Sequence, residues 1–387
     1  MKSAIQEQVT QKMDFLMEIV QYLYQNPEIS GQEVHSSQYL VRQLFDQGFQ
    51  VEAPFLNIEH SFRAEYNSNK AGASLAFFCE YDALPQIGHG CGHNLIAAMS
   101  IGAALAIRPF VDQLGGRIVL FGTPAEETDG AKVEMADQGA FDSFTAAMMV
   151  HPAAISEESG SSSALYPVEV SYYGKAAHAA MAPEKGANAL DAMILLFNSL
   201  YALKNRYTND VNIHGIITEG GRAANIIPEF SQARFYLRAP KKNLIDEVLK
   251  EIEQCALGAA MMTKTQVEVK KFEAAYDDLK TNQTLSQLFT ENLRQLGEKR
   301  IDPPTNSLGS IDMGNVSHRV PAIHPWMGIG DEALVIHTEE FAKQTITQGG
   351  RSCLFQGAAA MALTAYDVLV SDQVQKRISQ EFLLDQD

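Results

Sequence analysis

Cysteine is scarce in this chain, which has only Cys79, Cys91, Cys255 and Cys353 among 387 residues. So few and so widely spaced cysteines do not form the framework of a small disulfide-stapled protein. Long hydrophobic runs are also missing: no stretch approaches 18 uninterrupted apolar residues, so a membrane span is not expected. The N-terminus lacks the compact apolar core and small-residue cleavage site of a signal peptide. These absences predict a cytoplasmic protein.

Positive charge is in short supply, since 30 lysines and arginines face 47 acidic residues and the net charge is −17. Binding to phosphates needs a basic face, and none is visible, so we expect no nucleic-acid partner. The same acidity disfavours an anionic membrane surface. It does not exclude an anionic small substrate, because a site can be locally basic inside an acidic protein.

The first half of the chain alternates predicted strands and helices. Apolar stretches at 74–80, 117–122 and 146–150 predict strands without polar alternation, which is typical of a parallel sheet covered on both faces. The alanine-rich stretch 95–107 predicts a buried helix between the first two strands. This order indicates an α/β fold.

The pattern changes after about residue 165. The next predicted elements are a strand, a helix, two strands, a helix and a strand, at 167–174, 187–206, 211–219, 230–239, 242–260 and 265–272. That βαββαβ order is the one found in ferredoxin-like units. The chain then resumes helix, loop and strand and ends in a predicted long helix over 341–371. We therefore expect a catalytic domain made of residues 1–165 and 276–387, interrupted by an inserted lid domain of residues 166–275.

Three side chains that suit divalent transition metals alternate in IGHGCGHN, residues 87–94: His89, Cys91 and His93. Glycines between them let the backbone fold closely around an ion. In an extended loop, period-two spacing would place all three on one side. The alternative is a glycine-rich turn that carries a few polar residues.

Further candidate ligands follow other predicted strands. Glu126 and Glu127 in FGTPAEETDG lie at the C-terminal end of a strand, where open α/β sheets bind ligands, although acidic residues are also common at helix N-termini. His151 ends the third strand, and His337 follows a short apolar stretch that we take as another strand. A single histidine of this kind is usually structural. Three consecutive strand ends with such residues nevertheless converge on one sheet edge.

This set of donors favours zinc, manganese or cobalt over magnesium or calcium. A water held by two such ions ionises near neutral pH, and a nearby glutamate can pass its proton to a leaving amine. The pattern therefore predicts metal-dependent hydrolysis of an amide bond.

At these motifs the chain resembles the aminoacylase and carboxypeptidase family of dinuclear metallopeptidases, and within it the amidohydrolase branch. GHGCGHN and GSIDMGNVS (309–317) are similar to the B-type subunits of p-aminobenzoyl-glutamate hydrolase, to related dipeptidases and to HmrA-type proteins. The resemblance implies a mixed or parallel-sheet catalytic domain that binds two metal ions. It also implies a homodimer or higher homo-oligomer, formed through the inserted lid and dimerisation domain.

Carried over position by position, the resemblance implies two divalent ions, zinc or manganese, held by Cys91, His93, Glu127, His151 and His337. Glu126 matches the general base, and Asp82 in YDALP matches an acid that orients a ligand. Where the wider family usually has a histidine, two positions before this Asp82, the chain has Glu80, and His93 supplies the nitrogen instead. His89 is not counted among the ligands.

The inserted domain carries three further matches. His178 in GKAAHAA matches a histidine that reaches the active site of the partner subunit and stabilises the oxyanion. Asn225 and Arg238 match residues that bind the carboxylate end of the substrate, for which an arginine fork is well suited. The alternative for these residues is an ordinary polar position on a strand. Asn94 departs from most of the branch, which has aspartate there, and this disfavours hippurate-like or auxin-like substrates.

Together these features predict a hydrolase of amide or peptide bonds in N-acyl or N-aroyl amino acids or dipeptides, acting by metal-bound hydroxide with Glu126 as general base. Four alternatives stay open: a broader amino- or endopeptidase, a deacetylase, a subunit that needs a different partner subunit, and a metal-binding protein without catalysis.

Overall fold

The computed structural model describes residues 1–207 and 210–385. Its internal contacts divide the chain into two compact units. The larger unit contains Met1–Ser161, Leu279–Ser307 and Asp312–Asp387, and the smaller unit contains Ser162–Asp278 and Leu308–Ile311. The smaller unit begins at 162 and ends at 278, where the sequence indicated 166 and 275. It also includes a short returning segment that the sequence did not indicate.

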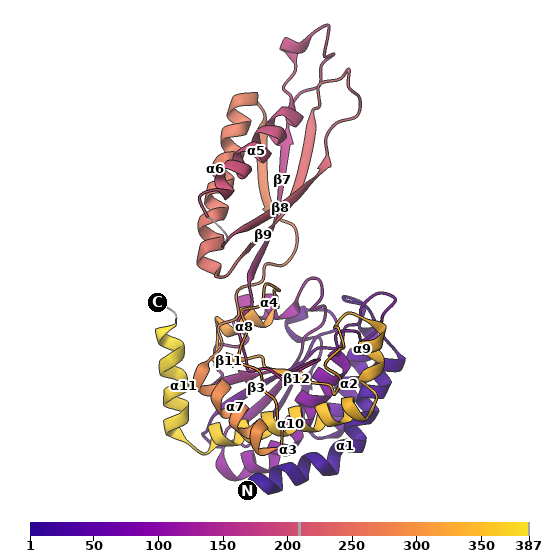
Figure 1. Ribbon diagram of the computed structural model, residues 1–387, viewed down its shortest axis with the longest axis vertical. Coiled ribbons are helices and arrows are strands. Elements are labelled where there is room, and N and C mark those ends of the chain that lie inside the picture. The colour runs from indigo at the N-terminus through magenta and orange to yellow at the C-terminus, as the bar shows by residue number, and fades with distance from the viewer. Residues whose placement is uncertain (208–209, 386–387) are drawn as a thin grey trace. The chain divides into compact units, whose positions relative to one another are not determined.

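The larger unit is built on a mixed six-stranded sheet (Figure 1). The order across it is β1 (Gln50–Glu52), β2 (Phe62–Asn67), β4 (Arg117–Gly122), β3 (Ser74–Cys79), β5 (Ala146–Met148) and β11 (Ala322–Ile323). The four strands from β4 to β11 are parallel, and β2 and β1 continue the sheet antiparallel. Nearly all residues of β3, β4 and β5 are buried, as expected for parallel strands covered on both faces.

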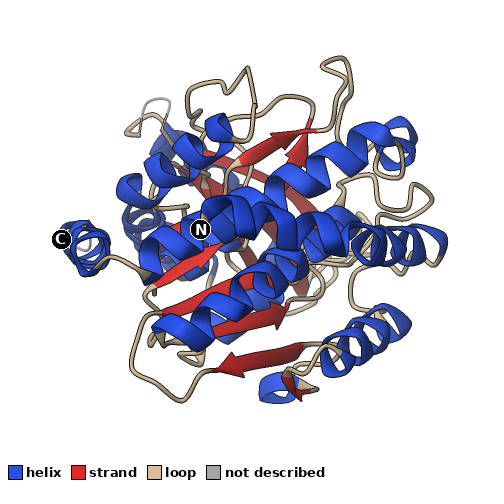
Figure 2. Ribbon diagram, turned by 90° about the horizontal axis from the view of Figure 1, so that it is seen from below, coloured by secondary structure: helices blue, strands red, loops and turns tan. Residues whose placement is uncertain are grey.

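Helices lie over these strands when the unit is seen from below (Figure 2). The long helices α3 (His93–Leu114) and α10 (Gln348–Leu369) pack on each other, and α1 (Lys2–Gln25) packs on α3. By length and composition α3 and α10 could cross a membrane, but 89% and 72% of their apolar windows are buried inside the structure. They are the core helices of this unit. The described part also contains η1 (Phe55–Asn57), α2 (Val34–Asp46), α4 (Ala131–Asp137), α7 (Gln283–Gln295), α8 (Met313–Ser317), α9 (Glu339–Gln344) and α11 (Asp372–Leu384).

A two-stranded parallel sheet pairs β6 (His151–Ala153) with β12 (Trp326–Gly328), so that Trp326 lies opposite His151. β6 starts only a few residues after β5 ends. Because β3, β4 and β5 are parallel, their carboxyl ends share one edge of the six-stranded sheet. The chain segments that follow these strands therefore begin at the same edge.

The smaller unit follows the predicted βαββαβ order. Its elements are β7 (Ala164–Tyr173), η2 (Pro183–Lys185), α5 (Ala189–Lys204), β8 (Asn212–Glu219), β9 (Phe230–Ala239), α6 (Lys242–Thr263) and β10 (Gln266–Lys271). The strands form an antiparallel sheet in the order β10-β7-β9-β8, and its apolar core includes buried residues of α5 and α6. The edge strand β8 exposes Ile216 and Ile217, which are 67% and 42% accessible.

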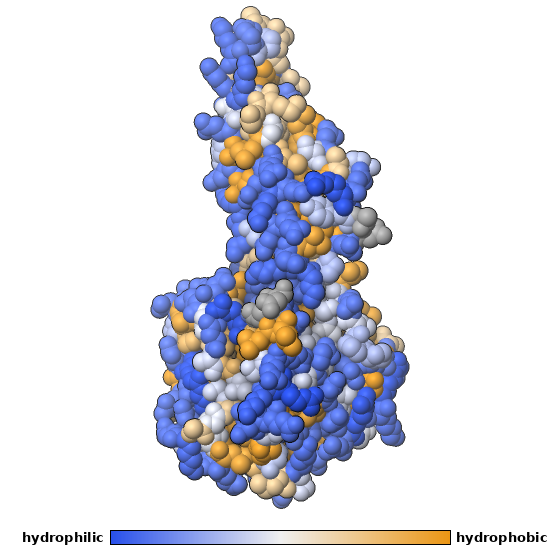
Figure 3. Space-filling model, turned by 90° about the vertical axis from the view of Figure 1, so that its left-hand side faces the viewer, coloured by the Kyte–Doolittle hydropathy of each residue, from blue (hydrophilic) through white to orange (hydrophobic). Residues whose placement is uncertain are grey.

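On the face drawn in Figure 3 hydrophilic residues predominate and hydrophobic ones form separate patches.

Two predictions for the C-terminal part are wrong. The predicted single helix over 341–371 is two helices, because α9 ends at Gln344 and Thr347 caps α10 by accepting a hydrogen bond from the Gly349 amide at 3.2 Å. The apolar stretch before His337 is a loop and not a strand. Short apolar stretches do not specify a strand unless a neighbouring strand pairs with them.

The break between α9 and α10 generates a stability prediction. A Cβ at Gly350 would overlap the carbonyl oxygen of Thr345, whereas a Cβ at Gly258, in α6, would meet nothing within 4 Å. We expect Gly350→Ala to lower the free energy of unfolding by about 1–3 kcal/mol. The control Gly258→Ala should raise it by up to about 1 kcal/mol through helix propensity. Urea unfolding of both variants measures this, and an unchanged midpoint for Gly350→Ala would contradict the packing described here.

Candidate metal centre and active site

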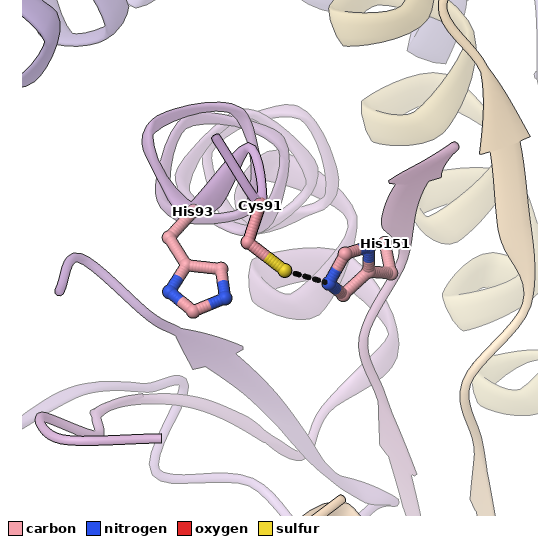
Figure 4. A group of neighbouring side chains, drawn as sticks. All are labelled: Cys91, His93 and His151. Carbon is pink, nitrogen blue, oxygen red and sulfur yellow. Dashed lines mark hydrogen bonds between the residues drawn. The ribbon is translucent and has the colours of Figure 1, made fainter. Parts of the chain in front are cut away.

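Six of the predicted site residues meet at the carboxyl edge of the six-stranded sheet. Possible ligand atoms within 4.8 Å of one another form three groups, and these groups share members. They are Cys91–His93–His151, Cys91–Glu127–His337 and His93–Glu126–Glu127. Figure 4 shows the first group, in which the Cys91 sulfur points toward the ring of His151. The structure therefore brings all five predicted ligands and the predicted base together.

The segment that carries Cys91 and His93 is a turn and not the extended loop that period-two spacing indicated. The Gly92 amide donates to the His89 carbonyl at 3.0 Å, and His93 is the first residue of α3. Gly92 has φ +81°, and a Cβ there would overlap Pro152, next to His151. His89 does not join any of the groups of ligand atoms, so the expectation that it shares one side with Cys91 and His93 is wrong. Burial, together with the neighbouring His93, lowers the pKa of His89 to about 3.

The histidine rings are oriented so that Nε2 faces the cluster. His93 Nδ1 lies 2.8 Å from Asp82 Oδ1, and His151 Nδ1 lies 2.8 Å from the Pro152 carbonyl oxygen. Both partners are acceptors, so each Nδ1 carries a hydrogen and donates it. His93 Nε2 has no hydrogen-bond partner among the described residues. These hydrogen bonds leave Nε2 of each ring pointing at the cluster, where it can bind a metal ion once it carries no proton.

The spacing of the donor atoms fits a metal ion as well. Cys91 Sγ is 3.4 Å from His151 Nε2, and His337 Nε2 is 3.3 Å from Glu127 Oε1. Two donors bound to the same tetrahedral ion lie roughly 3.4 Å apart, given metal–ligand bonds of about 2.0–2.3 Å. His337 reaches the cluster from a loop, where its amide donates to the Gly90 carbonyl at 2.8 Å.

Asp82 holds two parts of the centre in place. Its Oδ2 accepts from Ser30 Oγ at 2.7 Å and from the Glu127 amide at 3.1 Å, while Oδ1 accepts from His93. Burial alone would raise the pKa of Asp82, but His93 and these hydrogen bonds lower it to about 2. Asp82 is therefore an anion that orients His93, which is the geometry expected of a residue behind a metal ligand.

The electrostatics of the cluster favour an added cation. Burial, then the nearby Glu80 and Asp312, raise the pKa of Glu126 well above its ordinary value. Burial also raises the pKa of the Cys91 thiol. These groups resist ionisation first because burial removes them from water, and then because nearby negative charges repel the charged form. Bound divalent cations would supply the missing positive charge, so the residues present fit a centre of this kind.

Three residues beside the cluster were missed as site residues. Lys132 in α4 is completely buried, and its ammonium lies 2.6 Å from Glu80 Oε1 and 2.7 Å from Asp312 Oδ1. A lysine in a short amphipathic segment gives no sequence signal for such burial. Asp312 is the acidic residue of the motif GSIDMGNVS, and this position in a motif was a sequence signal for a residue near the site.

In the smaller unit, His178 and Asn225 lie on adjacent segments. The Ala179 amide donates to the Asn225 carbonyl at 3.0 Å, and the Ile227 amide donates to the Ala177 carbonyl at 2.9 Å. These bonds continue the β7–β9 pairing beyond Phe230. His178 Nδ1 accepts from the amides of Ala180 and Met181, at 3.3 and 3.2 Å, so its exposed ring carries its proton on Nε2.

Arg238 lies near the opposite end of β9. It pairs in register with Leu165, close to where the smaller unit begins, and its guanidinium donates to Ser310 Oγ at 2.9 Å. The eight-residue step from Phe230 to Arg238 spans roughly 26 Å of extended strand. Asn225 and Arg238 of one chain therefore cannot hold the same carboxylate.

Comparison with known proteins identifies the family. The profile of peptidase family M20/M25/M40 matches residues 77–354, which contain the whole metal centre. The chain belongs to this family. Membership in a peptidase family makes it a hydrolase of amide bonds, and the family expected from the motifs is confirmed.

Curated relatives cover most of this M20/M25/M40 chain. Xaa-Arg dipeptidase of Homo sapiens is 36% identical over 383 residues, covering 94% of this chain and 87% of that protein. The Mus musculus Xaa-Arg dipeptidase is 37% identical and covers 85% and 79%. The B-type subunit of p-aminobenzoyl-glutamate hydrolase from Escherichia coli (strain K12) is 30% identical and covers 72% and 62%.

Solved structures share the fold. An aminobenzoyl-glutamate utilization protein from Klebsiella pneumoniae has a TM-score of 0.73 and 19% identity, covering 92% of this chain and 97% of that one. A dinuclear metal-binding M20 peptidase from Bacillus subtilis has a TM-score of 0.67 and 20% identity, covering 93% and 99%. The likeness confirms the α/β fold class.

The donor set predicts a pH dependence of metal binding. In the metal-free protein the pKa values of Cys91 and His93 both lie above their ordinary range, so both groups hold protons at neutral pH. A metal ion must displace these protons. Its affinity should therefore fall as the pH falls, by up to about tenfold per pH unit for each proton displaced.

Zinc titrations between pH 6 and 8, in buffers of different ionisation enthalpy, measure the affinity and the protons released. Cys91→Ser should weaken binding. The control Cys353→Ser, which removes a buried thiol that joins none of the ligand groups, should not. An affinity that is independent of pH would contradict a thiol and imidazole ligand set.

Proposed function

We propose that this chain is a metal-dependent dipeptidase or amidohydrolase that removes a free C-terminal amino acid from dipeptides or N-acyl amino acids. The observation that carries the proposal is the convergence of Cys91, His93, Glu127, His151 and His337 around Glu126. A reducing cytoplasm suits this centre, because all four cysteines are free thiols and Cys91 would serve as a ligand.

The five ligand side chains would hold two divalent cations, zinc or manganese, and the thiol of Cys91 favours zinc. When bound, the cations supply Lewis-acid chemistry that polarises the amide carbonyl and acidifies water. Glu126 would take a proton from the attacking water and deliver it to the leaving amine nitrogen. The neutral imidazole of His178, with its proton on Nε2, would donate a hydrogen bond to the developing oxyanion.

Dipeptides that end in a basic residue are the first substrates to test. The Xaa-Arg dipeptidases share 36% and 37% identity with this chain, against 30% for the p-aminobenzoyl-glutamate hydrolase relative. The net charge of −17 also favours encounter with cationic substrates. Arg238 would bind the terminal carboxylate, because a guanidinium fork matches its two oxygens.

A substrate panel tests the function. It contains dipeptides ending in arginine, lysine or glutamate, their C-terminally amidated forms, p-aminobenzoyl-glutamate and hippurate. Amidation should lower kcat/KM about 10–100-fold, since it removes a charge-assisted hydrogen bond worth about 1.5–3 kcal/mol. Equal cleavage of free and amidated substrates would indicate an endopeptidase instead.

Glu126→Gln should lower kcat by about 10²–10⁴-fold on the best substrate while metal content stays unchanged. Full activity of this variant would rule out Glu126 as the base. Two metals per chain without turnover of any substrate would point to a required second subunit or to a binding protein.

We propose further that the enzyme is a homodimer or a higher homo-oligomer built through the smaller unit. The edge strand β8 offers unpaired backbone groups and exposed isoleucines, which suit pairing with a second copy. A dimer would also account for the separation of Arg238 from His178 and Asn225, since a second chain could supply the latter two residues.

Mixing two inactive variants tests this arrangement. His178→Ala and Glu126→Gln subunits, unfolded and refolded together in equal amounts, should regain about a quarter of wild-type activity, because half of the dimers would be mixed and each would hold one complete site. Each variant refolded alone is the control. Absence of rescue, with mixed dimers shown by mass spectrometry, would mean that each site is built within one chain.

A further inference from the structure

A buried carboxylate from a distant part of the chain contacts the turn that carries Glu126. Glu33 lies directly before α2, and its side chain is fully buried. Its Oε1 accepts a hydrogen bond from the Ala125 amide at 2.7 Å, across 92 positions of the sequence. Ala125 is the residue before Glu126, so this bond fixes the backbone from which the proposed general base extends.

Ala125 itself has an unusual backbone conformation. Its φ is +61°, in the left-handed region that residues other than glycine rarely adopt. Its carbonyl oxygen accepts from the amides of Thr128 and Gly130, at 3.2 and 2.7 Å. A strained conformation persists only where the surrounding contacts hold it, and such residues cluster at active sites. Here the turn holds the carbonyl of Ala125, and Glu33 holds its amide.

Capping of α2 does not account for Glu33. A polar residue at the N-cap usually accepts hydrogen bonds from the first turn of its own helix, but the Glu33 side chain makes no such bond. Glu28 caps the helix instead, since its two carboxylate oxygens accept from the amides of His35 and Ser36 at 3.0 and 2.7 Å. The carboxyl of Glu33 is therefore left for the Ala125 amide.

The segment before Glu33 is held against the same edge of the sheet. The Ala83 amide donates to the Glu28 carbonyl at 2.8 Å, and Ser30 Oγ donates to Asp82 at 2.7 Å. Burial, and then the nearby Asp82, raise the pKa of Glu33 to about 7. A neutral carboxyl still has one oxygen that accepts, so the contact with the turn does not require a negative charge.

We infer that Glu33 is a positioning residue for the general base: it holds Ala125 in its left-handed conformation and so directs Glu126 toward the attacking water. The inference rests on the proposed function and deepens it. It gives Glu33 a part in proton transfer and none in metal binding.

The test compares Glu33→Met, which has a similar length and no acceptor, with Glu33→Gln, which keeps one. We expect Glu33→Met to lower kcat about 10–100-fold on the best substrate, with KM and metal content unchanged. Glu33→Gln should stay close to the wild-type kcat, because its amide oxygen accepts from Ala125. The matched control is Glu28→Ala, which removes the cap of α2 and should lower stability without lowering kcat.

Amide hydrogen exchange gives a second readout that does not depend on activity. In the metal-free wild type the Ala125 amide should be protected, and in Glu33→Met it should exchange at least about tenfold faster, because its hydrogen bond is lost. Mass spectrometry of peptides that cover residues 123–130 measures this. Thermal melting checks folding, and Glu33→Asp, whose shorter side chain draws the acceptor away from the amide, decides the question if Glu33→Met unfolds.

Wild-type kcat or unchanged exchange in Glu33→Met would overturn the inference and leave the proposed function intact. An equal loss of kcat in Glu33→Gln or in Glu28→Ala would do the same, and so would loss of metal from Glu33→Met. Failure of the wild type to hydrolyse any substrate of the panel would overturn both.

Discussion

The parallel register of β3 with β4 and with β5 is the constraint on which the centre depends. It sets Cys79 opposite Gly122 and Phe77 opposite Met148, so three strands end at one edge. Each following segment is short, and each begins with a residue whose direction the strand has already fixed. A shift of one residue in either pairing would turn the side chains of that strand to the other face and separate the groups that meet there.

The same edge concentrates groups that repel one another when no cation is present. Glu80 and Asp312 are buried near Glu126, and the buried ammonium of Lys132 forms ion pairs with both of them. A core of this kind is poor as a stabilising device, since buried charges lose more in hydration than they gain from imperfect pairing. The buried charges lower the stability of the metal-free fold, and this loss is explained if groups at the same edge bind divalent ions.

The sequence was sufficient where local pattern decides the structure. Glu126, Glu127 and His151 lie within a few residues of a strand end, and a glycine-rich turn at the start of α3 carries Cys91 and His93. The βαββαβ order follows from hydrophobic periodicity. The sequence was insufficient where contacts with residues far along the chain determine the local structure or burial. His337 sits in a loop held by the Gly90 carbonyl, and Lys132 is buried only because Glu80 and Asp312 come from other segments. No local pattern records those partners.

A sequence motif does not record distances in space, and Arg238 is the clearest example. Thirteen residues separate it from Asn225, and a motif presents the two as neighbours. The chain between them is mostly extended, and the pairing of residues 174–179 with 225–229 carries Asn225 still farther from Arg238. Asn225 and Arg238 lie toward opposite ends of one extended segment, so they cannot both contact a dipeptide that is only a few ångströms long. If all three residues of the smaller unit act on one substrate, the strand itself makes a second copy of the chain part of the active site.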